Sequence, residues 1–68
     1  MNIYEKVGKR VRKLRESKGI SQSDLADKMQ THQCEISKLE TGKYNPSVQY
    51  LERVAKALKV KLSKLVEG

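Results

Sequence analysis

The stretch QSDLADKMQTHQCEISKLETGK, residues 22–43, constrains the fold more than any other part of the chain. Its apolar residues recur at the spacing of a helix's buried face: Leu25, Ala26 and Met29, then Ile36 and Leu39. The stretch therefore predicts two short amphipathic helices around a turn, with the rest of the chain supporting that pair.

The second helix of the pair has a polar outer face. At about 100° per residue, the side opposite Ile36 and Leu39 carries a set of small or polar side chains. They are Gln33, Cys34, Ser37, Lys38 and Thr41. A helix of this kind fits the major groove of B-DNA, which is about 12 Å wide, and its first turn can reach base edges.

These residues resemble the helix-turn-helix of the phage lambda repressor and Cro family, also called the XRE or Cro/C1 type. The matching positions are Gln22, the small Ala26 where the helices cross, hydrophobic Leu25, Met29, Ile36 and Leu39, and the run Leu39-Glu40-Thr41-Gly42-Lys43. The match extends from about Val7 to Val66. It implies one all-α domain over residues 1–68, of five helices, with the helix-turn-helix formed by helices 2 and 3.

Composition agrees with an anionic partner. Fifteen Lys and Arg against eight Asp and Glu give a net charge of +7 at pH 7, although the charge could serve solubility alone. A single cysteine excludes an intramolecular disulfide and favours a reducing cytoplasm. No run is apolar enough to cross a membrane, and MNIYEKVGKR lacks the apolar segment of a signal peptide.

Further helices are predicted on both sides of the pair. The core face of a helix over residues 3–18 is Ile3, Val7, Val11 and Leu14. Gly8, at the edge of that face, would let another helix approach, and Gly19 supplies a left-handed helix end. The core face of a helix over about residues 47–58 is Val48, Leu51, Val54, Ala55 and Leu58, and residues 60–66 suit a short fifth helix.

Arg15 borders the apolar face of the first helix instead of pointing away from it. The resemblance implies that Arg15 and Glu40 form a largely buried ion pair that ties the first helix to the third. The alternative is a solvated arginine on a basic helix. The pair would be structural and not a DNA contact.

Two helix ends depart from the family pattern. Relatives commonly have glycine where this chain has Gln30 and Lys59, because the backbone at both positions is left-handed. A residue other than glycine in that conformation costs about 1 kcal/mol. His32 stands at the expected N-cap of the third helix, where serine or threonine would cap better, unless the helix begins earlier and Thr31 caps it. One histidine beside one cysteine is not a metal site, because zinc needs three or four ligands.

We expect base reading from four residues on the outer face of the third helix: Gln33, Cys34, Ser37 and Lys38. The resemblance implies it for the first of them, Gln33. A glutamine can bond bidentately to adenine, and a lysine can reach guanine or a phosphate. Cys34 could contact a thymine methyl or have no role, Ser37 could bond a base or the backbone, and Glu35 points away from the groove.

Contacts to the DNA backbone are expected from the start of the second helix and the loop after the third. Ser21 and Asp24 form a capping box, so Gln22 is the first helical residue, where free amides suit a phosphate. The resemblance implies that Gln22 contacts the DNA backbone and that its side chain can brace the third helix. The resemblance implies that the loop amides and the side chains of Thr41, Lys43 and Tyr44 also contact phosphates. Each could instead be a plain exposed residue.

The chain is expected to bind double-stranded DNA as a homodimer at an inverted repeat. The resemblance implies that Leu62, Leu65 and Val66 form the dimer interface, and the alternative is that they complete the monomer's own core. The predicted role is transcription regulation in a bacterial cytoplasm, on the nucleoid, as a repressor, or as an activator if the protein touches RNA polymerase. Its length leaves no room for an effector domain, and no cofactor or small-molecule ligand is indicated.

Small phage repressors, restriction-modification controllers and autoregulatory antitoxins all fit these expectations. A protein-interaction module on the same fold is an alternative, because a basic helical surface could dock an acidic partner. An enzyme is not indicated: the chain has no carboxylate cluster, no paired nucleophile and base, and no metal-ligand set.

Overall fold

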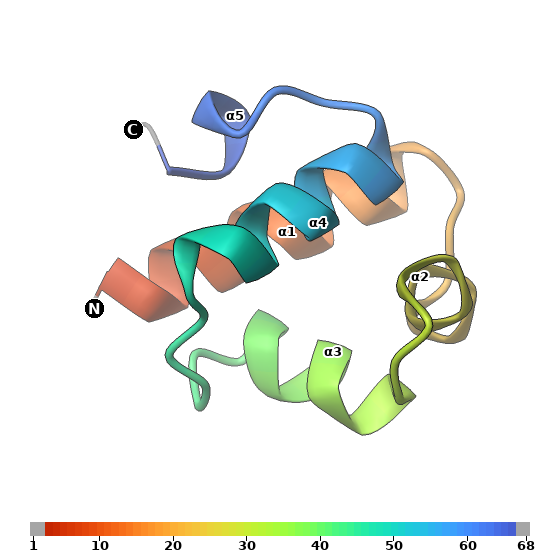
Figure 1. Cartoon of the computed structure of the whole chain (residues 1–68), viewed down its shortest axis with the longest axis horizontal. Coiled ribbons are helices and arrows are strands. Elements are labelled where there is room, and N and C mark those ends of the chain that lie inside the picture. The colour runs from red at the N-terminus through yellow and green to blue at the C-terminus, as the bar shows by residue number, and fades with distance from the viewer. Residues whose placement is uncertain (1–2, 67–68) are drawn as a thin grey trace.

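The computed structural model describes residues 3–66, which form five helices and no strand (Figure 1). The helices are α1 (Ile3–Ser17), α2 (Gln22–Met29), α3 (Gln33–Glu40), α4 (Val48–Leu58) and α5 (Ser63–Val66). The expected all-α, five-helix fold is confirmed. The fifth helix is shorter than the predicted 60–66, because it begins only at Ser63. Of the expected domain 1–68, residues 1, 2, 67 and 68 lie outside the described residues.

The helices surround one core. α1 and α4 run across the middle of the molecule, with α3 below them, α2 at one side and α5 above (Figure 1). α3 packs against α1 and α2, and α5 packs against α1 and α4. The helix-turn-helix is therefore attached to the rest of the chain through α1 and α4. Within residues 3–66 no helix has the length and apolar character needed to cross a membrane.

Every helix contributes to the hydrophobic core. Its buried members are Val7, Val11, Leu25, Ala26, Met29, Ile36, Leu39, Leu51, Val54, Ala55, Leu58 and Leu65. Two residues predicted for the core faces are instead exposed: Ile3 and Val48 each retain 64% of their surface. Each is the first residue of its helix, so it lies beyond the part of the helix that its neighbours cover.

Four helices end at a left-handed residue. These residues are Gly19 (φ +69°), Gln30 (φ +55°), Gly42 (φ +75°) and Lys59 (φ +58°). The conformation expected at Gln30 and Lys59 is thus confirmed although neither is glycine. At Gln30 it makes the tight turn between α2 and α3, since the Thr31 N–H donates back to Ala26 O at 2.9 Å.

Candidate nucleic-acid interface

The helix-turn-helix begins with a complete capping box. The Ser21 hydroxyl accepts from the Asp24 N–H at 3.0 Å, and the Asp24 carboxylate accepts from the Ser21 N–H at 3.2 Å. This reciprocal pair starts α2 at Gln22, as the sequence predicted. α3 starts after His32, whose backbone is extended and whose side chain makes no capping hydrogen bond within the described residues.

A buried ion pair joins α1 to the end of α3. Arg15 Nε lies 2.7 Å from Glu40 Oε2, and Arg15 Nη2 lies 3.1 Å from Glu40 Oε1. Arg15 Nη1 also donates to Ile20 O at 2.7 Å. The arginine is 8% exposed and the glutamate 6%. The hydrogen bond to Glu40 raises the pKa of Arg15 above its usual value, against the opposing effect of burial, so the guanidinium stays charged.

Two glutamines extend this pair to the surface. Gln22 Nε2 donates to Glu40 Oε1 at 3.1 Å, and Gln33 Nε2 donates to Gln22 Oε1 at 3.4 Å. Gln22 is half-buried and Gln33 is exposed. The first side chain of α3 is therefore linked through Gln22 to the buried pair, and Gln22 braces α3 as the family resemblance implied.

Gly8 brings the backbones of α1 and α3 into direct contact. A Cβ atom at this position would lie 2.3 Å from Leu39 O and 2.7 Å from Glu40 O. No side chain fits in that space unless the helices move apart. The glycine expected to allow a close approach does so at the last turn of α3, next to the ion pair.

The residues expected to read bases share the outer surface of α3. Gln33, Cys34 and Lys38 are exposed, and Ser37 is half-buried. Glu35 is half-buried on another side of the helix. The pKa of Tyr50 is raised mainly by the burial of its own side chain, and the nearby charge of Glu35 raises it further. Three of the four side chains thus lie on an outward face that the rest of the fold leaves exposed, and Ser37 lies partly covered beside them.

The four residues expected to contact the DNA backbone differ in what they can offer a phosphate. Thr41 Oγ1 donates its single proton to Ser37 O at 2.9 Å, and Gln22 is bonded as described above. Tyr44 is half-buried and meets Tyr50 edge to face, with ring centroids 5.3 Å apart. The exposed ammonium of Lys43 is therefore the best placed of the four.

The loop amides expected to contact phosphates are partly engaged within the protein. The N–H groups of Thr41, Gly42 and Lys43 donate to the last carbonyls of α3, at 3.1, 3.3 and 3.0 Å. These bonds close the C-terminal turn of the helix around left-handed Gly42. The expectation fails for these three amides because the helix end requires them.

The residues expected at a dimer interface divide between core and surface. Leu65 is fully buried within its own chain, so it belongs to the core and is not available to a second chain in this conformation. Leu62 is half-buried against the core, and Val66 remains 45% exposed. The sequence left open whether these residues form a dimer interface or complete the monomer's own core. Leu65 belongs to the core, and the exposure of Val66 is compatible with a dimer interface.

One positioning residue was missed by the sequence analysis. Arg53 Nη2 donates to Met29 O at the end of α2, and its guanidinium lies 5.9 Å from the Tyr50 ring centroid. Arg53 thereby ties α4 to the helix-turn-helix. Its position three residues after a tyrosine in a helix was the available signal. No group of three or more potential metal ligands occurs within residues 3–66.

Comparison with known proteins identifies the same architecture. A family model described as Helix-turn-helix matches residues 11–65. The immunity repressor protein of Bacillus phage phi105 is 35% identical over 60 residues, which cover 88% of this chain and 42% of that protein. SinR of Bacillus subtilis is 36% identical over 62 residues, covering 90% of this chain and 56% of that regulator. The chain thus spans about half the length of the curated relatives it matches.

Solved structures agree. The restriction-modification controller protein C.AhdI from Aeromonas hydrophila superposes with a TM-score of 0.85 at 33% identity, over 88% of this chain and 91% of that one. A crystal structure of SinR in complex with DNA superposes with a TM-score of 0.83 at 35% identity, over 90% of this chain and 98% of that one. The chain therefore belongs to the helix-turn-helix family, of the XRE type that its sequence resembles.

Proposed function

We propose that this chain is a sequence-specific regulator of transcription that binds double-stranded DNA with α3 in the major groove. The observation that carries the proposal is the outward face of α3, which is polar, uncovered and fixed from behind by the buried Arg15–Glu40 pair. The similarity to an immunity repressor, and to SinR as solved with DNA, supports the same conclusion.

Base reading falls to the four residues of the outward face. Gln33 is first, because a carboxamide can donate to and accept from adenine and its link to Gln22 limits its conformations. Lys38 contacts guanine or a neighbouring phosphate, and Cys34 packs against a thymine methyl. Ser37, half-buried beside them, bonds a base edge or the backbone.

Affinity comes mainly from contacts that do not depend on sequence. Lys43 neutralises a phosphate beside the groove, while Gln22, Thr41 and Tyr44 help to shape the surface around it. With a net charge of +7, the chain should bind less tightly as salt rises, because each neutralised phosphate releases counterions.

The protein acts as a homodimer on an inverted repeat. Two α3 helices then enter successive major grooves about 34 Å apart. Exposed Val66 and half-buried Leu62 contribute to the dimer contact, with Leu65 supporting them from inside the chain. Bound to DNA in the bacterial cytoplasm, the dimer represses by occluding a promoter, or activates where it touches RNA polymerase. Binding alone accounts for the site, so we propose no catalysis and no cofactor.

Selection from a random duplex library tests this proposal. The bound pool is sequenced at moderate salt, and the stoichiometry of the complex is measured. An enriched inverted repeat bound by two chains supports a dimeric, sequence-specific regulator. Salt-sensitive binding without any enriched sequence would reject specific recognition and favour a protein-interaction module instead.

A further inference from the structure

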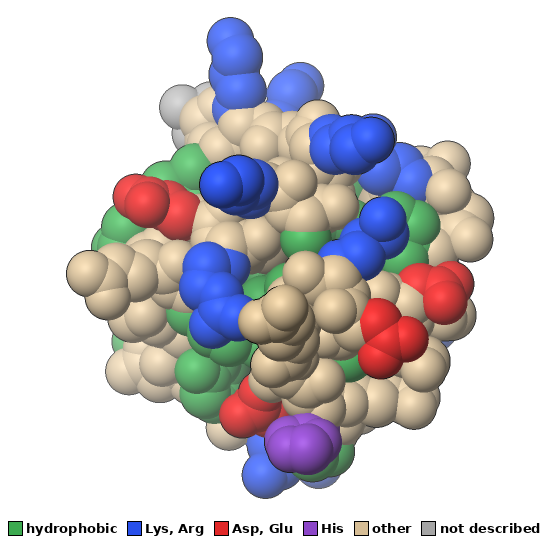
Figure 2. Space-filling view, turned by 45° about the vertical axis from the view of Figure 1, so that its right-hand side comes forward, with side chains coloured by type: hydrophobic (Ala, Val, Ile, Leu, Met, Phe, Trp, Pro, Cys, Tyr) green, Lys and Arg blue, Asp and Glu red, His purple; other side chains and the backbone are tan. Residues whose placement is uncertain are grey.

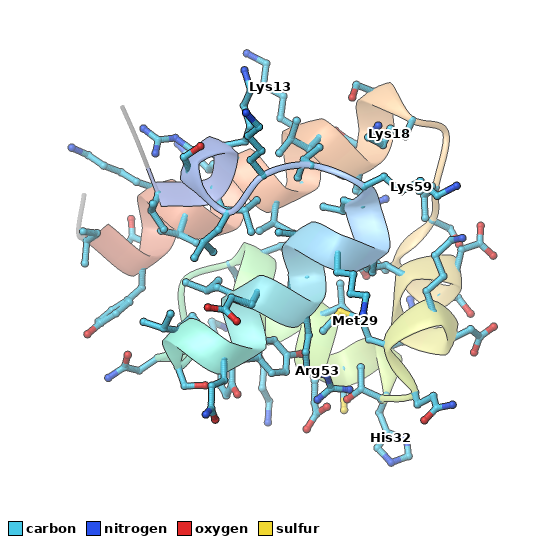
Figure 3. The ribbon with its side chains drawn as sticks, turned by 45° about the horizontal axis from the view of Figure 1, so that its top comes forward. Lys13, Lys18, Met29, His32, Arg53 and Lys59 are labelled. Atoms are coloured by element: carbon cyan, nitrogen blue, oxygen red, sulfur yellow. The ribbon has the colours of Figure 1, made fainter. Side chains whose placement is uncertain are left out.

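A pocket with a cationic rim lies away from the outward face of α3. It has a volume of about 490 Å³ and lies between the C-terminal part of α2 and that of α4. The lining residues are Lys28, Met29, Gln30, Arg53, Lys56, Ala57 and Lys59. Lys59, Met29 and Arg53 follow one another along the side where α4 faces α2 (Figure 3). The volume is within the range of about 300–1,000 Å³ typical of ligand sites.

The rim and the floor of the pocket differ in chemistry. All four charged residues of the lining are cations and all are exposed: Lys28, Arg53, Lys56 and Lys59. The floor includes buried Met29 and half-buried Ala57, which are apolar. Lys and Arg side chains lie over the upper and central part of this side of the molecule, with acidic side chains to the left, to the right and below them (Figure 2). The pocket therefore suits a ligand that combines negative charge with an apolar group.

Arg53 is already fixed at the edge of this pocket. One N–H of its guanidinium bonds Met29 O, and the guanidinium lies 5.9 Å from the Tyr50 ring centroid. An arginine has five N–H donors in a rigid fork, so donors remain for a carboxylate. Because the side chain is ordered before binding, little conformational entropy is lost when it engages a ligand.

We propose that this pocket docks an acidic segment of a partner protein, in which carboxylates flank an aliphatic side chain. The aliphatic group would lie over half-buried Ala57, next to the small part of Met29 that its own chain leaves exposed, and the carboxylates would meet cations on both helices. A small anion would leave Ala57 uncovered. A DNA phosphate would do the same, and the lining residues come from α2 and α4 with their caps, not from α3 or the loop after it. The proposal goes beyond DNA binding and does not depend on it.

The Met29 methyl group provides a direct readout. The chain has two methionines, so ¹³C-methyl labelling gives a spectrum in which the floor of the pocket is easily assigned. The probe is a synthetic peptide with leucine between glutamates. Its controls carry glutamine for every glutamate, or serine for the leucine. We expect the first peptide to shift the Met29 signal in a saturable way, the glutamine peptide to have no effect, and the serine peptide to bind more weakly.

A matched pair of charge variants tests the location. The pocket variant combines Lys28→Gln, Lys56→Gln and Lys59→Gly, and glycine suits the left-handed backbone at residue 59 (φ +58°). The control variant combines Lys6→Gln, Lys9→Gln and Lys13→Gln on α1, so both lose three charges at exposed positions. We expect about tenfold weaker peptide binding in the pocket variant. The control should change it by no more than about twofold, because salt screens distant charges.

Several results would overturn the proposal. They are equal losses in both variants, unchanged binding in the pocket variant, or equal binding of the glutamine peptide. A shift of the Met29 signal by duplex DNA but not by the acidic peptide would make the pocket a phosphate contact instead. Melting curves of both variants establish that each is folded. None of these outcomes bears on sequence-specific DNA binding, which the selection from random duplexes tests separately.

Discussion

α2 and α3 form one motif, but they are stabilised at opposite ends. α2 is fixed at its start by the Ser21–Asp24 capping box, which is entirely local. α3 begins without a side-chain cap in the described residues and is fixed at its last turn, where Glu40 meets Arg15 and Gly8 touches its backbone. A helix that presents its first turn to a ligand can leave that turn open if tertiary contacts hold its other end.

Removing Arg15 should have the largest effect. In Arg15→Ala, Glu40 would remain buried without its cation, so we expect the free energy of unfolding to fall by about 3–5 kcal/mol. Chemical denaturation measures this. The control is Arg12→Ala, because Arg12 pairs with Glu16 at 3.4 Å on the surface, where such pairs contribute about 0–1 kcal/mol. Equal stability of the two variants would show that the buried pair does not hold α3.

A methyl group at Gly8 should separate α1 from α3. The new Cβ would lie 2.3 Å from Leu39 O, so Gly8→Ala should cost about 1–3 kcal/mol in spite of the better helix propensity of alanine. Lys9→Ala, at the next and exposed position, should change stability little. Thermal melting of both variants decides, and a Gly8→Ala protein as stable as the Lys9→Ala protein would contradict the close contact.

The two helix starts should respond unequally to alanine. Ser21→Ala removes a capping hydrogen bond and should lower the free energy of unfolding by about 1 kcal/mol. His32→Ala removes no capping hydrogen bond, so it should change the free energy of unfolding by no more than about a few tenths of a kcal/mol. Urea titrations resolve this difference. Equal losses at both positions would mean that α3 depends on its start as much as α2 does.

A small gain in stability is expected at the turn between the two helices. Gln30 has φ +55°, so Gln30→Gly should stabilise the protein by up to about 1 kcal/mol. Gly19 is the matched reverse case: it has φ +69° and open space where a Cβ would lie, so Gly19→Ala should cost a similar amount. If Gln30→Gly destabilises the protein, the glutamine side chain makes a contribution that its backbone conformation does not explain.

Features within a few residues of each other could be predicted from the sequence, whereas long-range contacts could be predicted only where Gly8 or the family resemblance pointed to them. The capping box from Ser21 to Asp24 and the left-handed ends at Gln30 and Lys59 are local. The Arg15–Glu40 pair spans 25 residues, and only the family resemblance pointed to it. Arg53 bonding to Met29 O was missed because it depends on how α4 meets α2.

Core membership was less certain near chain and helix ends. Ile3 and Val48 have the spacing of core residues but begin their helices, so too little of the fold covers them. Leu65 shows the opposite case, because the short α5 turns it fully inward. In the candidate site, the exposed positions on α3 could be predicted from helical periodicity. The hydrogen bonding of the loop amides could not, because these N–H groups donate to carbonyls in the C-terminal turn of α3.

The most direct test of the account compares Gln33→Ala with Lys43→Ala on a panel of duplexes derived from the selected site. Gln33→Ala should lose discrimination at one position in each half-site, by about 1–3 kcal/mol, because a base contact is removed. Lys43→Ala should weaken binding to every duplex alike and lower its salt dependence, because a phosphate contact is removed. If both variants lose affinity uniformly across the panel, α3 does not read the sequence through Gln33 and the central claim fails.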